Sequence, residues 1–257
     1  MEIAIIYLAA FLAAILTFFS GFGLGTVLTP VFAIFFPIEV AVALTGVVHF
    51  FNNIFKLFLV GKKANKNVLL RFGIPAVLAA ALGAWLLLEL TGLKPLLRYS
   101  VGERTFEVSP VNLTVALLLI AFAMMELIPR FRQLQFGKRQ LPLGGALSGF
   151  FGGLSGNQGA LRSAFLIRAG LSKEAFIGTG VVVSTFIDLT RLSVYSTRFA
   201  TAGLEENVGL VAAATLAAIT GAFLGNRLLK KLTLGFIQKL VAVMLLLLSV
   251  ALGAGFI

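Results

Sequence analysis

The sequence contains no cysteine and a single histidine, His49, among its 257 residues. The absence of cysteine excludes disulfide bonds, thiolate chemistry and cysteine-ligated metal sites. One histidine also excludes a metal site built from several histidines of one chain. No G-x-x-x-x-G-K-[ST] run is present, so direct use of ATP through a phosphate-binding loop is not expected. The residue types therefore predict no cofactor and no bound metal.

Charge is scarce as well. Charged residues make up 12% of the chain, whereas 59% of the residues are apolar and the mean hydropathy is +1.03. This leaves too little polar surface for a soluble protein of this length. Runs of roughly 20 apolar residues can cross ~30 Å of hydrocarbon as helices. We predict an all-α integral membrane protein with spanning helices at about 38–60, 68–92, 110–129, 173–197, 208–226 and 234–256.

The first apolar run lacks the marks of a cleaved signal peptide. Residues 3–19 follow Met1 and Glu2 with no lysine or arginine, and no small-residue cleavage site leads into a polar segment. We therefore count this run among the membrane segments.

Two glycine-interrupted segments, separated by 135 positions, resemble each other. Residues 19–25 read FSGFGLG and residues 154–159 read LSGNQG, and each segment is followed by a Thr-Gly-Val-Val run, at 45–48 and 179–182. In transporters, matching interrupted segments in the two halves indicate a substrate site between inverted repeats.

We predict two inverted membrane repeats, 1–130 and 140–257, joined by a basic cytoplasmic linker at 131–139. Each repeat contains a re-entrant helical hairpin, at 3–36 or 141–169, and three spanning helices, which makes eight membrane segments. In the alternative interpretation, 3–19 and 22–36 each cross the membrane fully.

The net charge of +11 is concentrated beside the predicted membrane segments. Three clusters hold most of it: Lys62, Lys63, Lys66 and Arg71; Arg130, Arg132, Lys138 and Arg139; and Arg227, Lys230, Lys231 and Lys239. Such clusters are typical of cytoplasmic loops, whereas the alternate loops 93–109 and 198–207 mix both signs. The charge therefore indicates topology rather than nucleic-acid binding. It predicts that both termini lie outside and that 141–169 enters from the cytoplasmic face.

The two hairpin tips predict an anion site. Glycines permit a tight reversal, and a helix that begins after the reversal, near Thr26 or Ala160, directs free N–H groups and roughly half a positive charge at the tip. The predicted substrate-binding residues are Ser20, Gly21, Gly23, Gly25, Thr26, His49, Asn52, Asn53, Ser155, Gly156, Asn157, Gln158, Gly159, Arg162 and Ser184. The alternatives are close helix packing for the glycines, and pairing of Arg162 with a carbonyl or with Asp188.

Polar triplets at matching positions follow the two interrupted segments. His49, Asn53 and Lys56 correspond to Ser184, Asp188 and Arg191, and each triplet lies on one face of its helix. His49 is either a proton carrier or a neutral side chain bonded to a carbonyl. Asp188 either carries a proton or forms an ion pair with Arg191 or Arg162. Lys56 and Arg191 lie nearer helix ends, where we expect them to snorkel to the headgroups.

The glycine-rich segments resemble those of the sulfite exporter TauE/SafE family of membrane permeases, also called TSUP. Residues 20–25 followed by Pro30 resemble its first signature, and residues 149–161 followed by 170–171 and 178–180 resemble its second. The resemblance implies transport of sulfite, thiosulfate or an organosulfonate such as sulfoacetate. Gln158 and Arg162 depart from the more apolar form of the second signature, which leaves the particular substrate open.

These observations predict a proton-coupled secondary transporter whose partners are a small anionic substrate, protons and the lipid bilayer; a homodimer is compatible with the interface glycines. Two alternatives stay open. One is an anion channel that uses the same helix ends. The other is an intramembrane serine hydrolase, because residues 153–156 match a short G-x-S-G pattern and His49 is a candidate base.

Overall fold

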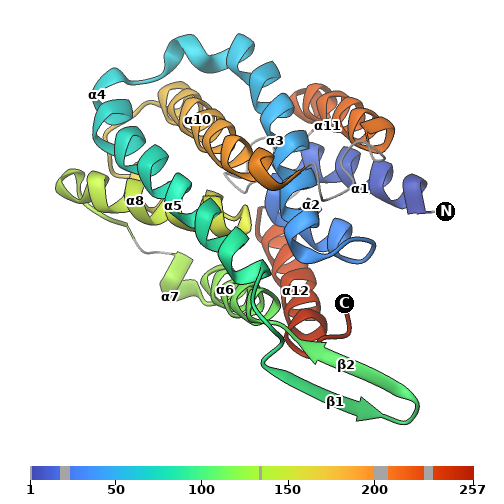
Figure 1. The fold of residues 1–257 in the computed structure, drawn as a ribbon. Coiled ribbons are helices and arrows are strands. Elements are labelled where there is room, and N and C mark those ends of the chain that lie inside the picture. Colours follow the sequence, from blue (N-terminus) through green and yellow to red (C-terminus); the bar gives the residue numbers. More distant parts are fainter. Residues whose placement is uncertain (1, 18–23, 133–134, 200–207, 229–233) are drawn as a thin grey trace.

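The computed structural model describes residues 2–17, 24–132, 135–199, 208–228 and 234–257. The described chain is almost entirely helical, with one short β-hairpin (Figure 1). The helices are α1 (Glu2–Thr17), α2 (Leu24–Ala33), α3 (Ile38–Val60), α4 (Lys66–Val68), α5 (Ile74–Thr91), α6 (Pro110–Leu127), α7 (Pro129–Arg132), α8 (Leu141–Ser155), α9 (Gly159–Leu166), α10 (Lys173–Phe199), α11 (Val208–Leu228) and α12 (Leu234–Gly253).

The long helices coincide with the apolar runs of the sequence. Three stretches of the described chain are long and apolar enough to cross a membrane, namely Ile38–Lys63, Lys66–Thr91 and Lys173–Thr197, and several shorter apolar helices accompany them. These features agree with an all-α membrane protein. The eight-segment arrangement stays a prediction.

The run predicted as one helix at 68–92 is divided. A π-helical turn, η2 (Leu69–Gly73), lies between α4 and α5. Pro75 is in the first turn of α5 and has no N–H with which to continue the α-helical hydrogen-bond pattern. A π turn is a common response to such a local disruption.

Both interrupted segments contain a short second helix. At 1.5 Å per residue, α2 is about 15 Å long and α9 about 12 Å, so neither can cross ~30 Å of hydrocarbon alone. α8 ends at Ser155, and the next residue, Gly156, has a left-handed φ of 77° and donates its N–H to the Gly152 carbonyl. This geometry favours the hairpin interpretation for 141–169. The tip of the first hairpin, with the predicted site residues Ser20, Gly21 and Gly23, lies outside the described residues.

Glycines hold α8 against α5. A Cβ atom at Gly145, Gly149 or Gly153 would collide with the main-chain carbonyl oxygen of Phe72, Ala76 or Ala80, respectively. The spacing of four residues places these glycines on one face of α8. Close helix packing is therefore the role of this stripe, as distinct from the glycines at the hairpin tip.

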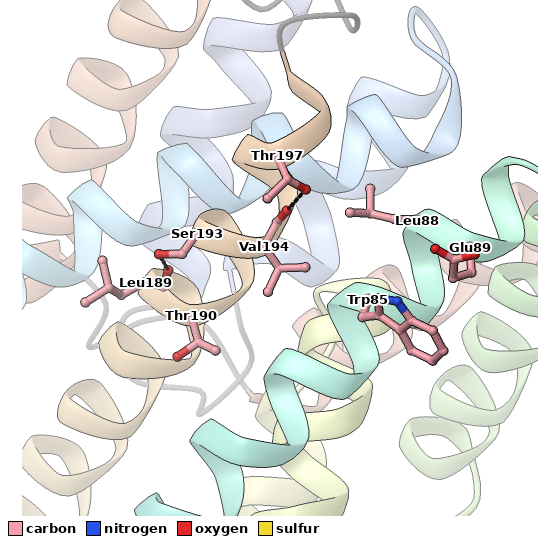
Figure 2. Close-up of a pocket in the computed structure, with 8 residues that line it drawn as sticks. All are labelled: Trp85, Leu88, Glu89, Leu189, Thr190, Ser193, Val194 and Thr197. Carbon is pink, nitrogen blue, oxygen red and sulfur yellow. Dashed lines mark hydrogen bonds between the residues drawn. The ribbon is translucent and has the colours of Figure 1, made fainter.

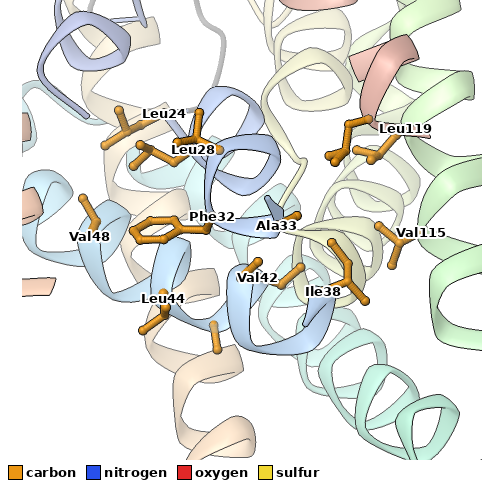
Figure 3. Packing of buried hydrophobic residues seen from close by; sticks show 14 of the residues in the cluster. Leu24, Leu28, Phe32, Ala33, Ile38, Val42, Leu44, Val48, Val115 and Leu119 are labelled. Atoms are coloured by element: carbon orange, nitrogen blue, oxygen red, sulfur yellow. The ribbon is translucent and has the colours of Figure 1, made fainter. Parts of the chain in front are cut away.

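An apolar core surrounds the short helix α2. Leu28 and Phe32 of α2 pack in the same buried cluster as Leu44 and Val48 of α3 and residues of α6 (Figure 3). All four of these side chains are fully buried. The core anchors α2 from its second turn onward, so the first turn has a defined position beside α3.

A β-hairpin, missed by the sequence analysis, occupies the loop at 93–109. β1 (Leu97–Val101) pairs with β2 (Arg104–Val108) around Gly102, which has a φ of 62°. The hairpin projects from the helical body near the C-terminus (Figure 1). Tyr99 donates a hydrogen bond to the Ala254 carbonyl at 2.5 Å. Alternating side chains on each side of a Gly-Glu pair are the sequence signal for this element.

Three basic segments meet at one end of the molecule. The Asn65 N–H donates to Thr179 Oγ1 at 2.9 Å, Arg168 Nε donates to Gln135 Oε1 at 2.5 Å, and a Cβ at Gly170 would lie 3.0 Å from Lys138 Nζ. We call this end the basic face, formed by Lys62, Lys63, Lys66, Lys138, Arg168 and Lys173. It groups the ends of 141–169 with the loop after α3, and the cytoplasmic location of this end stays a prediction. Lys230 and Lys231, of the third predicted basic cluster, lie outside the described residues.

Candidate functional site

A buried polar cluster joins the two predicted triplets between α3 and α10. His49 Nδ1 lies 2.6 Å from Asp188 Oδ2, and Asn53 Nδ2 donates to the same oxygen at 3.1 Å. The other carboxylate oxygen accepts from Arg191 Nε at 3.0 Å and lies 2.8 Å from Arg191 Nη2. Residues from both halves of the chain thus share one carboxylate, and the ion pair of Asp188 is with Arg191.

The expectation that Lys56 and Arg191 reach the headgroups is wrong. Arg191 is 0% exposed and Lys56 is 9% exposed. Both residues lie on the faces of α3 and α10 that turn toward the polar cluster. The expectation failed because it used distance from the helix end, whereas the partner across the helix interface decides where a long cationic side chain points.

Two glycines bring main chain close to Arg191, and a third glycine packs against one of them. A Cβ at Gly46 would lie 3.2 Å from Arg191 Cζ, and a Cβ at Gly156 would lie 3.0 Å from Arg191 Nη1. A Cβ at Gly25 would lie 3.0 Å from the Gly156 carbonyl oxygen. The first turn of α2 and the tip of the second hairpin therefore meet beside one guanidinium. We call Gly25, Gly46, Gly156 and Arg191 the glycine cluster.

Several buried polar atoms near these elements have no hydrogen-bond partner within the described protein. They are Thr29 Oγ1, Thr45 Oγ1, Asn157 Oδ1, Arg191 Nη1 and both side-chain amide atoms of Asn52 and Gln158. A Cβ at Gly156 would lie 3.6 Å from Thr29 Oγ1, and a Cβ at Gly25 would lie 3.4 Å from Thr45 Cγ2. Leaving such groups unsatisfied is costly. A polar ligand that accepts hydrogen bonds would satisfy the donors among them.

The structure places Arg162 and Ser184 apart from the glycine cluster. Arg162 Nη1 donates to Ser184 Oγ, and a Cβ at Gly180 would lie 3.4 Å from Arg162 Nε. Ser184 precedes Arg191 by seven residues, which is about 10 Å along α10. The predicted site is therefore divided into two groups, with Asp188 between them.

The remaining predicted residues help to form the hairpin itself. Ser155 Oγ donates to the Phe151 carbonyl at 3.0 Å, and Asn157 Nδ2 donates to the Ser155 carbonyl at 3.3 Å. The Gln158 carbonyl accepts from Ser148 Oγ at 3.3 Å. Gly159 begins α9, and Gly159 and Thr26 are both buried. The Ser155 hydroxyl thus hydrogen-bonds to the last turn of its own helix, α8, while His49 bonds to Asp188.

An open groove between α5 and α10 is a separate feature (Figure 2). Its volume is about 710 Å³, and its lining includes Trp85, Glu89, Thr190, Ser193 and Thr197. The three hydroxyl groups donate to main-chain carbonyls of α10 itself, so they are already satisfied. A carboxylate in the lining also disfavours anions. The groove contains none of the predicted site residues.

The sequence analysis missed Thr29, Thr45 and Gly46 as neighbours of the site. Thr29 follows Thr26 by three residues, and Thr45 precedes His49 by four, so each shares a helix face with a residue that was named. Helical periodicity is the signal that identifies both threonines. Nothing local identifies Gly46, because its role is the close approach of Arg191 from another helix.

Comparison with known proteins gives one family. A family model described as Sulfite exporter TauE/SafE matches residues 6–252. The match spans both glycine-interrupted segments and all the helices of the polar cluster. No curated protein and no solved structure matches the chain.

Proposed function

Because the chain belongs to the sulfite exporter TauE/SafE family, a family of membrane transporters and not of enzymes, we propose that it is a secondary transporter of a small sulfur-containing anion. Sulfite, thiosulfate and organosulfonates such as sulfoacetate are the candidate substrates. The observation that carries the proposal is the fully buried guanidinium of Arg191, which lies beside Asp188 and the Tyr195 hydroxyl and whose Nη1 faces the tip of the second hairpin.

The substrate binds where the two interrupted segments meet. Arg191 supplies positive charge, and the hydroxyl groups of Thr29 and Thr45 supply neutral donors beside Gly25 and Gly156. The first turn of α9 adds main-chain N–H groups at the same tip. Irregular backbone at membrane depth is tolerated where it is buried in protein or lines a water-filled cavity. The site requires two short helices, α2 and α9, whose first turns lie near the midplane of the membrane.

An inverted repeat accounts for the helix contacts. A shift of 135 residues exchanges α1 with α8, α3 with α10 and α5 with α11. α6 and α12 hold the same place in the order of the two repeats, although α12 begins 11 residues earlier than this shift gives. α5 packs on α8, and the equivalent pair, α11 and α1, also pack on each other. α3 packs on its own equivalent, α10, and α6 packs on its equivalent, α12. Asn53 and Asp188, which are equivalent residues, contact each other directly. A pseudo-two-fold axis through this contact would place the substrate site between the repeats.

The basic face lies in the cytoplasm under this proposal. The protein is an integral membrane protein. Lysine and arginine are enriched at the three segments of the basic face, as the positive-inside rule requires of cytoplasmic segments. We propose a bacterial inner membrane location with both termini outside. The β-hairpin and the C-terminus then lie together on the outer side.

The substrate itself is identified by binding and counterflow. We expect purified protein to be stabilised against heat by sulfite, thiosulfate or sulfoacetate more than by acetate or other simple carboxylates, because the three oxygens of the sulfur group can accept from Arg191, Thr29 and Thr45 together, whereas a carboxylate has two oxygens. Radiolabelled substrate should then show saturable counterflow in proteoliposomes. Large electrical conductance without exchange would favour the anion channel instead, and equal stabilisation by all anions would argue against a selective site.

Proton coupling is the second part of the proposal, and it rests on the contact of His49 with Asp188. We expect an imposed inward proton gradient of one pH unit to drive substrate accumulation by up to about tenfold per coupled proton. Replacement of His49 by glutamine or of Asp188 by asparagine should abolish this response. Transport should be measured in proteoliposomes with the membrane potential held at zero.

Glu103→Gln, in the exposed turn of the β-hairpin, is the control for proton coupling, since it removes an acid without touching the site. Its gradient response should equal that of the unaltered protein. Wild-type flux that ignores the gradient would reject proton coupling and leave the anion transporter intact.

A further inference from the structure

Arg162 and Ser184 form a pair on the cytoplasmic side of the polar cluster. The guanidinium of Arg162 donates to a neutral hydroxyl, whereas Arg191 is matched by the carboxylate of Asp188. The hydroxyl of Ser184 does not neutralise Arg162, and Asp188, which attracts Arg162 electrostatically, forms its ion pair with Arg191. At membrane depth a charge such as that of Arg162 is expensive and usually marks a pathway for an ion or substrate.

The pair lies on a line that leads from the basic face to the glycine cluster. Along α10, Gly178 packs against Val60 and the loop containing Lys63, Gly180 and Ser184 contact Arg162, Asp188 follows, and Arg191 comes last. These positions span 13 residues, or about 20 Å of helix. Lys56, buried on α3, is an electrostatic neighbour of Arg162. Positive charge thus continues inward from the surface.

We propose that Arg162 and Ser184 form a second anion-binding station, with Lys56 beside it, through which the substrate passes between the basic face and Arg191. The inference rests on the proposed transport function and deepens it. An oxyanion can accept N–H and O–H donors from Arg162 and Ser184 together.

Asp188 separates the two stations. Its carboxylate repels an anion that moves directly between them. Arg191 forms the ion pair with this carboxylate, His49 and Asn53 make hydrogen bonds to it, and Arg162 attracts it electrostatically. Ser184 and Arg191 are about 10 Å apart along the axis of α10, and the carboxylate of Asp188 lies between the two stations, so we expect each station to hold its own ion. Two ions can therefore be held by one chain.

The test is the number of thiosulfate ions bound per chain, measured by equilibrium dialysis of detergent-purified protein with radiolabelled thiosulfate. We expect two ions for the unaltered protein and one for Arg162→Gln. Ser184→Ala should weaken binding of the second ion at least severalfold. This variant takes the place of Arg162→Gln in the test if Arg162→Gln does not fold. Lys94→Gln, an exposed change in the loop before β1, is the control and should keep two ions.

The outcomes separate the two proposals. One ion bound by the unaltered protein, or two ions retained by both Arg162→Gln and Ser184→Ala, would overturn the second station while leaving a transporter with one site. No binding of thiosulfate, sulfite or sulfoacetate at any concentration would overturn the transport proposal itself. In transport, we expect Arg162→Gln to raise the KM for substrate presented at the basic face more than the KM for substrate presented at the opposite side.

Discussion

Replacement of Gly156 by alanine should reduce substrate binding and transport by at least about 30-fold. Two effects combine at this residue. Its φ of 77° is left-handed, which costs an alanine about 1–2 kcal/mol, and the added Cβ would lie 3.0 Å from Arg191 Nη1. The methyl group would occupy the space in which an anion meets the guanidinium, and loss of such a charge-assisted contact costs about 2 kcal/mol or more.

The chain offers a matched control for this substitution. Gly102, in the turn of the β-hairpin, has a φ of 62°, and no heavy atom lies within 4 Å of the position that an added Cβ would take. Gly102→Ala should therefore carry the same backbone strain and leave transport unchanged. The comparison is made by counterflow and by thermal stability of both variants. Equal transport by Gly156→Ala and the unaltered protein would mean that the anion does not bind at this tip.

Replacement of Arg191 by glutamine should both destabilise the protein and abolish transport. The change leaves the carboxylate of Asp188 buried without its ion-pair partner, and breaking a buried pair by removing one member costs about 3–5 kcal/mol. It also removes the cation proposed to bind substrate. A large drop in melting temperature and loss of counterflow are the expected readouts.

The double variant Asp188→Asn with Arg191→Gln distinguishes the two effects. It removes both charges, so most of the lost stability should return, because the uncompensated carboxylate is gone. Transport should not return, since the substrate cation is still missing. Recovery of transport in the double variant would show that Arg191 serves only to neutralise Asp188.

Most helix positions could be predicted from the sequence because they depend on local properties. Apolar runs, prolines and glycines determine where a helix in a membrane can begin and end, and α3 spans the range predicted for it. The β-hairpin at 97–108 was missed because hydropathy does not report alternation within a short, mixed-charge loop.

The candidate residues could be named from the sequence, but their grouping could not. Periodicity places His49, Asn53 and Lys56 on one helix face, and it says nothing about what lies opposite. The contact with Asp188, the burial of Arg191 and the distance between Arg162 and Arg191 all depend on how α3, α9 and α10 pack.

The sequence by itself determined that this is a helical membrane protein with two glycine-interrupted segments, since hydropathy and backbone freedom belong to each residue and its near neighbours. Only the tertiary structure decided that His49 and Asn53 contact the carboxylate of Asp188, which lies 135 or more positions away in the sequence. It also decided that Arg162 and Arg191 lie on either side of that carboxylate. Those features arise from helix packing, where close approach at glycines brings distant side chains within hydrogen-bond distance.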